Sequence, residues 1–589
     1  MDFKQKAEEK KMSMSKNIAR LAVTAGLTAA LSFGGVMAPV TMAFADDVAA
    51  PDKSITIKKV DEANKDNTFK AYQIFKAKVA DEGSEGKVAS DIEWSSTTIG
   101  PKVVAAIKGS AKYKEIVAAD GAAALADGAT APVVAEWLAI NVTGTSASTG
   151  TSSAGTRVAP GDVLYAIAAA VAGETPAGNS IKVGTPWTRP DTNEDGLYGD
   201  GYYLFVSDSL KKDKPNTGTS PIFAIVGGDS VTVTEKTSIP TVSKKVKDDR
   251  PNSNWADKAD SQMGQNVNYQ LTGTVADNVA SFSAYKYEFY DELSAGLTAD
   301  EDSIKVYAGT DRGTAKEITA GNNYTADVTA DEVTGKSTLT VKFTDLKTAV
   351  ADLSAQTKIY VEYTAKLDPQ KDANIVVGGN GNENTVTLVY SNNPMEEGTG
   401  TSVPDTVRDY TYALKLVKED SANDAIKLEG VKFSIQATGP DDSNSKNLYV
   451  QEDGSLGSNE HEFATNENGE INVKGLDAGT YTVKETHALN DYNTLPKFTF
   501  TIFASDLNQD EGNNTLTVTA TKGESDLVLD PVVNGGTVTL TVKNKKGSGL
   551  PLTGLNGVTF TWIAGGAVLC IGVAHLIRSR KQAEESEQE

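Results

Sequence analysis

The sequence contains very few of the side chains that build disulfides, metal centres and hydrolytic active sites. Among its 589 residues there is one cysteine, Cys570, and there are three histidines, His461, His487 and His575. A single cysteine excludes an internal disulfide, and the same scarcity excludes a zinc site made of cysteine and histidine. A Ser-His-Asp or Cys-His catalytic site is disfavoured for the same reason. We therefore expect neither an enzyme nor a bound metal or other cofactor.

Positive charge is also scarce. The chain has 56 Lys and Arg against 79 Asp and Glu, which gives a net charge of -23. This net charge argues against binding to nucleic acid through a basic face. The acidic residues are dispersed rather than gathered in runs, so most of this charge is solvated surface. The length predicts three or four domains.

Long apolar stretches occur only near the two ends of the chain. The stretch "VTFTWIAGGAVLCIGVAHLI", residues 558–577, contains no Asp, Glu, Lys or Arg. At about 1.5 Å per residue a helix of this length spans about 30 Å, the thickness of one hydrocarbon core. Arg578, Arg580 and Lys581 follow it, so the acidic tail should stay in the cytoplasm and everything before Val558 should lie outside. The sequence thus predicts a single C-terminal transmembrane helix.

The N-terminal end is typical of an exported protein. A basic segment, "KKMSMSKNIAR", precedes the apolar segment "LAVTAGLTAALSFGGVMAPV". Small residues at Ala43 and Ala45 then form a cleavage site before Asp46. Residues 1–45 are predicted to be a signal peptide, cut between Ala45 and Asp46, and because Cys570 lies in the membrane span, the exported part has no cysteine.

The exported part alternates apolar and polar residues with period two. Runs such as "SITIKKV", "GYYLFVSD", "STLTVKF", "KIYVEYTAKL" and "GTVTLTVKN" are rich in Val, Thr, Ile and Tyr and are bounded by Gly, Asn and Asp. This pattern predicts β-strands in tandem sandwich-like domains, so the fold class is all-β. Residues 98–172 are the exception, because "PKVVAAIKGSAKYKEIVAA", "APVVAEWLAI" and "APGDVLYAIAAAVAG" predict helices. We interpret them as an insertion into the first β-domain.

Proline-bearing transitions divide the exported part. "TEKTSIPTVSKKVKDD" around Pro240 and "VPDTVRDYTYALKLVKED" around Pro404 separate three domains. The predicted boundaries are 46–240 for the first domain, 241–406 for the second and 407–547 for the third. Residues 548–589 then hold a short motif, the membrane span and the basic tail.

The short motif is "LPLTG", made of Leu550, Pro551, Leu552, Thr553 and Gly554. Followed by an apolar span and a basic tail, it resembles the cell-wall sorting signal of sortase substrates. The resemblance implies that a transpeptidase cuts between Thr553 and Gly554 and passes the threonine carbonyl to an amine. It also implies attachment to peptidoglycan in the cell wall.

The third domain is similar to collagen-adhesin B-type domains, which are Ig-like β-sandwiches. Its opening, "YALKLVKEDSANDAIKLEGVKFSI", its central "TNENGEINVKGLDAGTYTVKETHALNDY" and its closing "TVTLTVKN" carry the likeness. The resemblance implies an intramolecular Lys-to-Asn isopeptide bond, with Lys415 as nucleophile, Asn544 as electrophile and Glu485 as catalytic acid. Strand phase places Asn544 with the core residues, and it places Lys415 on one face with Ala413 and Val417.

The second domain resembles the fimbrial isopeptide-forming, collagen-adhesin A-type domain in "IPTVSKKVKDD", "YKYEFYDELSAGLT" and "GNENTVTLVYSNNP". The resemblance implies a bond from Lys244 to Asn392 with Asp291 as catalytic acid. Lys245 and Asn393 are the alternatives, because a bulge would bring them in instead. No bond is expected in the first domain, whose closing strand "SPIFAIVGGDSVTVTEK" contains no asparagine.

Lys236 decides between two functional interpretations. "VTVTEKTSIP" keeps the Val-x-Val-x-x-Lys spacing of the lysine motif of shaft pilins, but Thr234 and Glu235 replace its Tyr and Pro. The resemblance implies that Lys236 accepts the Thr553 carbonyl of another subunit, so that a pilus-type sortase polymerises identical subunits head to tail. A housekeeping sortase, ancillary pilins and a host surface are the further implied partners. The alternative is a wall-anchored adhesin or minor pilin that does not polymerise.

One acidic turn resembles the start of a calcium loop. "DTNEDG" places Asp191, Asn193 and Asp195 at alternate positions, but position twelve is Tyr202 instead of Glu. A solvated turn is favoured over a metal site.

Overall fold

The computed structural model describes residues 53–81, 87–119, 123–142, 157–191, 199–208, 210–440, 443–505, 507 and 516–547. The predicted signal peptide and the predicted sorting motif and membrane span lie outside these residues. Among the residues described, the structure contains no helix with the length and apolarity needed to cross a membrane. The described chain forms two compact units, one of residues up to Thr411 together with 504–517, and one of 412–503 together with the residues from Val518 onward.

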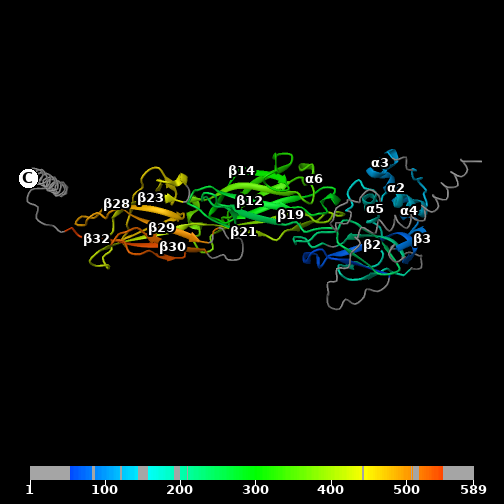
Figure 1. The fold of residues 1–589 in the computed structure, drawn as a ribbon, viewed down its shortest axis with the longest axis horizontal. Helices are drawn as coiled ribbons and strands as arrows, with labels where there is room; N and C mark the ends of the chain where they lie inside the picture. The colour runs from blue at the N-terminus through cyan, green and yellow to red at the C-terminus, as the bar shows by residue number, and fades with distance from the viewer. Residues whose placement is uncertain are drawn as a thin grey trace, which may run out of the picture. The chain divides into compact units, whose positions relative to one another are not determined.

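The described residues of the first domain form two sheets and four α-helices, which Figure 1 shows with their labels. The smaller sheet has the order β5-β1-β8, and the larger has the order β3-β2-β6-β7 with β4 paired to β2. The strands are β1 (Ser54–Lys58), β2 (Thr68–Asp81), β3 (Lys87–Trp94), β4 (Ile181–Lys182), β5 (Trp187–Thr188), β6 (Gly201–Ser207), β7 (Ile222–Val226) and β8 (Val231–Thr234). The helices are α2 (Ile99–Gly109), α3 (Ala111–Ala119), α4 (Ala131–Asn141) and α5 (Val163–Val171).

The strand β6 is covered on one face by the helices and on the other by the smaller sheet. All seven of its residues are buried, as expected for a strand that is covered on both faces. Tyr202 and Leu204 pack with the helices, whereas Tyr203 and Phe205 pack toward the smaller sheet. The four helices lie between β3 and β4 in the sequence, which confirms the helical insertion that residues 98–172 predict.

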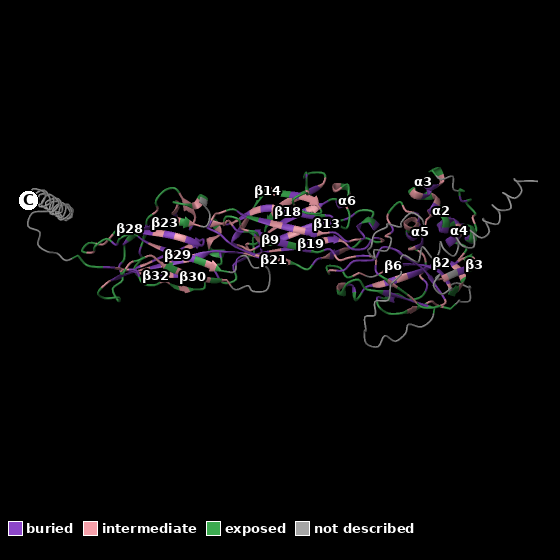
Figure 2. Ribbon diagram, in the orientation of Figure 1, coloured by how far each residue is buried: buried purple, intermediate pink, exposed green. Residues whose placement is uncertain are grey.

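The second domain is a sandwich of two antiparallel-rich sheets with the orders β10-β9-β12-β18-β14-β15 and β11-β21-β19-β13-β17-β16, and with β20 paired to β19. Its strands are β9 (Val242–Lys247), β10 (Trp255–Ala256), β11 (Lys258–Asp260), β12 (Val267–Thr274), β13 (Tyr287–Leu293), β14 (Leu297–Gly309), β15 (Lys316–Ile318), β16 (Tyr324–Ala330), β17 (Ser337–Phe343), β18 (Lys358–Leu367), β19 (Asn382–Ser391), β20 (Thr399–Thr401) and β21 (Asp405–Tyr410), with the short helix α6 (Leu346–Ala349). Burial alternates along β12 and β19, so every second side chain enters the core between the sheets. Figure 2 colours the ribbon by the burial of each residue.

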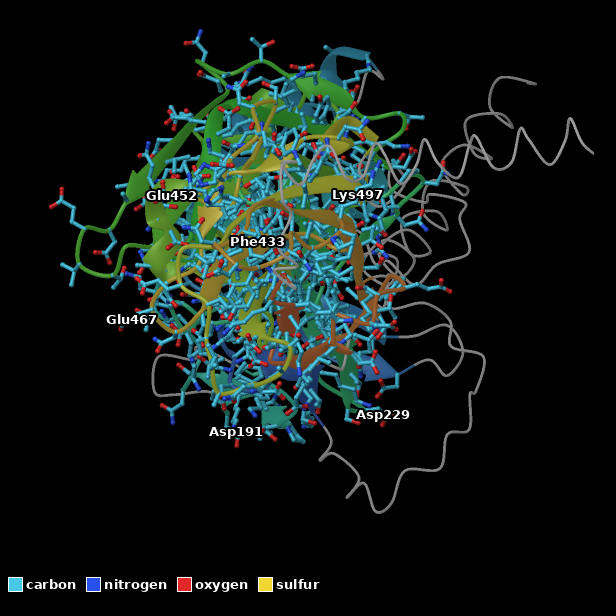
Figure 3. All side chains as sticks on the ribbon, turned by 90° about the vertical axis from the view of Figure 1, so that its left-hand side faces the viewer. Asp191, Asp229, Phe433, Glu452, Glu467 and Lys497 are labelled. Atoms are coloured by element: carbon cyan, nitrogen blue, oxygen red, sulfur yellow. The ribbon has the colours of Figure 1, made fainter. Side chains whose placement is uncertain are left out.

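The third domain has sheets of the orders β27-β22-β32-β31 and β25-β24-β23-β28-β29-β30, with β26 paired to β23. Its strands are β22 (Tyr412–Asp420), β23 (Lys432–Pro440), β24 (Tyr449–Val450), β25 (Leu456–Gly457), β26 (Phe463–Ala464), β27 (Glu470–Leu476), β28 (Gly479–His487), β29 (Phe498–Ser505), β30 (Thr517–Lys522), β31 (Val532–Asn534) and β32 (Thr537–Asn544). The first strand, β22, pairs in parallel with the last, β32. In Figure 3, Phe433 lies within the ribbon and the exposed Glu452 and Glu467 lie at its edge.

The mostly β architecture with a helical insertion agrees with the fold class that the sequence predicts. No sheet of the described residues contains strands from both sides of Pro240. The predicted second boundary, after residue 406, falls inside β21, and the two compact units divide between Thr411 and Tyr412.

Candidate functional site

A lysine, a glutamate and an asparagine meet in the core of the third domain. Lys418 Nζ donates a hydrogen bond to Asn544 Oδ1 at 2.5 Å and lies 3.0 Å from Glu485 Oε2. Asn544 Nδ2 donates to Glu485 Oε1 at 2.8 Å. All three side chains are buried, and the ring of Phe433 lies beside the amine, 5.4 Å from Nζ to its centroid. We call Lys418, Glu485 and Asn544 the third-domain cluster.

Strand pairing produces this cluster. Burial alternates from Tyr412 to Leu416 along β22, and Lys418 continues the buried series. Asp420 of β22 lies opposite Asn544 of β32 in the parallel pair, so Lys418 and Asn544 are diagonal neighbours on the inner face. Glu485 comes from β28 in the facing sheet. The cluster therefore joins the first and last strands of the domain.

Burial sets the electrostatics of the third-domain cluster. Removal from water lowers the pKa of Lys418 to about 8, although the Glu485 carboxylate opposes this shift. An amine with this pKa is partly neutral near physiological pH, and the neutral amine is the nucleophilic form.

The structure corrects the expectation for Lys415. This residue lies on the outer face of β22, its side chain is 37% exposed, and Nζ forms an ion pair with Glu470 Oε1 at 2.7 Å. The physical reason is strand phase, because Leu414 and Leu416 occupy the inward positions on either side of it. Lys418, which the sequence reasoning missed, has the parity of those leucines, and that parity was the available signal.

A second buried lysine lies in the second domain. Lys244 Nζ donates to Asp291 Oδ1 at 2.6 Å, to Asp291 Oδ2 at 2.5 Å and to the Tyr363 hydroxyl at 3.0 Å. The rings of Tyr269 and Tyr363 each have their centroid 5.3 Å from Nζ. Burial lowers the pKa of Lys244 to about 8, against the attraction of Asp291. Lys244 comes from β9 and Asp291 from β13, which belong to facing sheets.

The asparagine near this lysine is Asn384. Its Nδ2 donates to the Tyr363 hydroxyl at 2.6 Å, so one oxygen atom contacts both Lys244 and Asn384. Its Oδ1 is buried and has no hydrogen-bond partner among the described residues. We call Lys244, Asp291, Tyr363 and Asn384 the second-domain cluster.

The structure does not bring Asn392 to Lys244, and it corrects that expectation. Asn392 lies at the far end of β19, where Nδ2 donates to Asn216 Oδ1 of the first domain at 3.1 Å and its carbonyl accepts from the Gly218 N–H at 2.6 Å. Asn384 has the same parity, but it lies at the start of the strand. The phase argument predicted the inward face of β19, but it did not predict the position along the strand at which an asparagine lies near Lys244.

The two alternative residues, Lys245 and Asn393, also contact other groups. Lys245 Nζ forms an ion pair with Asp257 at 2.8 Å, and Asn393 Oδ1 accepts from the Met395 N–H at 3.1 Å. Neither contacts Asp291 within the described residues.

Lys236 lies two residues after the end of β8 and is partly buried. Its N–H donates to Thr219 Oγ1 at 2.8 Å, and its carbonyl accepts from the Ser220 N–H at 3.1 Å. Burial, and secondarily the positive charge of Arg157, lower the pKa of Lys236 to about 8. The backbone at this lysine is therefore fixed, and its amine loses its proton more easily than an ordinary lysine.

Glu235, which replaces the proline of the pilin motif, has a structural role here. Its carboxylate accepts hydrogen bonds from Asn64 Nδ2 at 2.9 Å, from Asn67 Nδ2 at 3.1 Å and from the Val60 N–H at 3.1 Å. Burial raises its pKa. These bonds tie the end of β8 to the start of the domain.

The remaining predicted sites lie wholly or partly outside the described residues. Ala45, Asp46 and the segment from Leu550 to Gly554 are outside them, as are Asn193 and Asp195. Asp191 forms an ion pair with Arg189 at 3.0 Å, and Tyr202 is a core residue of β6. No group of metal-ligating side chains occurs in the part of the chain that the structure describes.

Comparison with known proteins gives one match to a family model and several matches to solved structures. The model of the SpaA prealbumin-like fold domain matches residues 413–522. The T6 backbone pilin of Streptococcus pyogenes is similar with a TM-score of 0.46 and 15% identity, over 85% of this chain and 100% of that one. The major pilin SpaD of Corynebacterium diphtheriae has a TM-score of 0.41 and 14% identity, over 86% and 100%. BcpA, the major pilin subunit of Bacillus cereus, has a TM-score of 0.35 and 18% identity, over 63% and 92%.

No curated protein matches the chain. The family match extends over most of the third domain, from the first strand, β22, to β30. Residues 413–522 are therefore similar to the SpaA prealbumin-like fold domain.

Proposed function

We propose that this protein is the shaft subunit of a cell-surface fimbrium, cross-linked internally by isopeptide bonds and externally by a sortase. The observation that carries the proposal is the third-domain cluster, in which a buried amine contacts the amide of a buried asparagine beside a buried carboxyl group. A buried lysine is not expected to be present for stability alone, because transferring its charge from water into the core has an unfavourable free energy.

The chemistry of the third-domain cluster is an amide exchange. Lys418 gives a proton to Glu485, and the neutral Nζ attacks Cγ of Asn544. The new C–N bond forms, the bond from Cγ to Nδ2 breaks, and Nδ2 leaves as ammonia after it receives the second proton that Nζ loses. Glu485 contacts both nitrogens, so it can move that proton between them. The second-domain cluster supports the same reaction between Lys244 and Asn384.

Formation of these bonds is tested by the mass of the intact exported chain. Each bond removes one ammonia, about 17 Da, so two bonds remove about 34 Da relative to the sequence mass. An unshifted mass would refute both bonds.

Lys236 and Thr553 are the proposed polymerisation pair. The sorting-signal resemblance makes Thr553 the acyl donor to a pilus-type sortase, and the fixed backbone and lowered pKa of Lys236 suit an acceptor amine. One donor and one acceptor on each identical subunit produce an open head-to-tail filament. A housekeeping sortase then attaches the filament to peptidoglycan, and ancillary pilins and a host surface are the remaining partners that we propose.

The test is a denaturing gel of cell-wall extracts from cells that lack the original copy. The chain with Lys236→Ala is compared with the unaltered chain and with Lys211→Ala, which removes an exposed lysine of the same domain. A detergent-resistant ladder that collapses only in Lys236→Ala supports a shaft pilin. A ladder that survives moves the acceptor to another lysine. Monomer in every lane, in a strain with a pilus-type sortase, favours the alternative, a wall-anchored adhesin or minor pilin.

A further inference from the structure

The two clusters differ in how the carboxyl group reaches the amide. In the third domain, Glu485 contacts the lysine and also accepts from Asn544 Nδ2 directly. In the second domain, Asp291 is one methylene shorter and makes no hydrogen bond to Asn384 within the described residues. The gap is filled by Tyr363.

The Tyr363 hydroxyl contacts each of the other three residues of the second-domain cluster. It donates to Asp291 Oδ2 at 2.6 Å, and it accepts from Asn384 Nδ2 at 2.6 Å and from Lys244 Nζ at 3.0 Å. In the third-domain cluster, among the described residues, no tyrosine hydroxyl takes part, and the contacts run directly between Lys418, Asn544 and Glu485.

We propose that Tyr363 is a catalytic residue of the second-domain isopeptide bond and carries a proton from Asp291 to the departing nitrogen of Asn384. This inference rests on the proposed function, because it requires that Lys244 and Asn384 react. Tyr363 comes from β18, two strands away from β9, so its position is fixed by the same sheet that holds Lys244.

The proton path balances. Lys244 gives one proton to Asp291, and its neutral Nζ attacks Cγ of Asn384. As the bond from Cγ to Nδ2 breaks, Tyr363 passes its own hydroxyl proton to Nδ2 and takes the proton that Asp291 holds. The second Nζ proton returns Asp291 to its protonated form. The products are the amide, one ammonia and an unchanged tyrosine.

The hydroxyl is suited to this task because it stays protonated. Burial, and then the nearby Asp291 charge, raise the pKa of Tyr363 well above its ordinary value. A neutral hydroxyl can accept one proton while it donates another, which a phenolate or a carboxylate cannot do alone.

The chain supplies a closely matched control. Tyr269 stacks on Tyr363 with ring centroids 5.3 Å apart and an interplanar angle of 13°. Both rings lie 5.3 Å from Lys244 Nζ, and both are buried. The Tyr269 hydroxyl, however, has no hydrogen-bond partner among the described residues. The two tyrosines thus share packing and differ in contact with the reacting atoms.

The experiment follows bond formation in the full chain with Tyr363→Phe or Tyr269→Phe. Chains are collected in denaturant directly after synthesis, refolded, and sampled over time for the cross-linked peptide that joins Lys244 to Asn384. We expect this bond to form at least about tenfold more slowly with Tyr363→Phe and at an unchanged rate with Tyr269→Phe, since general acid-base groups typically contribute more than that. The third-domain bond should form at the same rate in every chain.

The outcomes separate the two proposals. If the unaltered chain forms neither cross-link, the proposed isopeptide chemistry fails. If it forms both and Tyr363→Phe is as fast as Tyr269→Phe, only the role of Tyr363 is overturned. Replacing Tyr363 with 3-fluorotyrosine keeps the hydroxyl and the fold but makes the hydroxyl more acidic. The rate should then change, and an unchanged rate would overturn the role even if Tyr363→Phe fails to fold.

Discussion

Replacing Lys418 with methionine should prevent the proposed isopeptide bond of the third domain. Methionine fills a similar buried volume without an amine, so the packing beside Phe433 is preserved and no cross-link can form. Lys418 and Asn544 are 126 positions apart. Closing a loop of that length removes conformational entropy from the unfolded chain worth about 5 kcal/mol.

Losing this free energy should lower the midpoint temperature of unfolding considerably. For a domain of this size, each kcal/mol moves the midpoint of unfolding by about 3–4 °C, so Lys418→Met should lower it by about 15–20 °C. Scanning calorimetry measures the shift, and the intact mass of the same sample should rise by about 17 Da beyond the substitution because ammonia is retained.

Lys415→Met is the matched control. Lys415 lies on the same strand, three positions away, and makes only an exposed ion pair with Glu470. Its replacement should change the free energy of unfolding by no more than about 0.5 kcal/mol and leave the mass loss intact. If Lys415→Met abolished the cross-link and Lys418→Met kept it, the geometric reasoning about the inner face of β22 would be refuted.

Two further results follow from the same clusters. Asn384→Ala should abolish the second-domain ammonia loss and Asn392→Ala should keep it, as read from the mass of each purified chain; the opposite pattern would restore Asn392 as the electrophile. In an Asn544→Ala chain, which cannot react, burial still lowers the pKa of Lys418 from 10.5 to about 8. Between those values the unfolded chain binds a proton that the folded chain has lost, so urea titrations should show stability rising with pH across that window, and a falling stability would contradict the assignment.

Strand phase explains what the sequence could and could not predict about the clusters. In "YALKLVKED" Lys418 shares its parity with Leu414 and Leu416, but Lys415 shares its own with Ala413 and Val417, so alternation favours Lys418 without excluding Lys415. The structure decides it, because Leu414 and Leu416 are buried and Lys418 follows them. A hydrophobicity pattern counts every lysine as polar and therefore predicts that it faces outward. The partners that stabilise a buried lysine come from other strands, which the pattern of one strand does not contain.

The asparagine of the second domain shows a different limit. Asn384 and Asn392 have the same parity, and both are buried. Phase fixes the face of a strand, whereas the position along it depends on where the facing sheet places Asp291 and Tyr363. That placement is tertiary, so local pattern could not distinguish the two. The helical insertion was predictable because its 3.6-residue periodicity is local to each helix.

The corrected positions change how the two bonds would act under tension. In the third domain, a bond from Lys418 to Asn544 joins the first strand to the last, so the residues between them cannot extend when the chain is pulled from its ends. In the second domain, a bond from Lys244 to Asn384 reaches only the start of β19. The segment 385–411 then lies outside the closed loop and is held to the domain by non-covalent contacts alone. These are the pairing of β19 with β13 and of β21 with β11, the burial of side chains such as Val386 and Val407, and the hydrogen bond from the Lys244 N–H to Asp405 Oδ2. Force on the second domain would thus pass through one covalent bond and these non-covalent contacts in series, and the contacts, not the isopeptide bond, would set the load at which this domain lengthens.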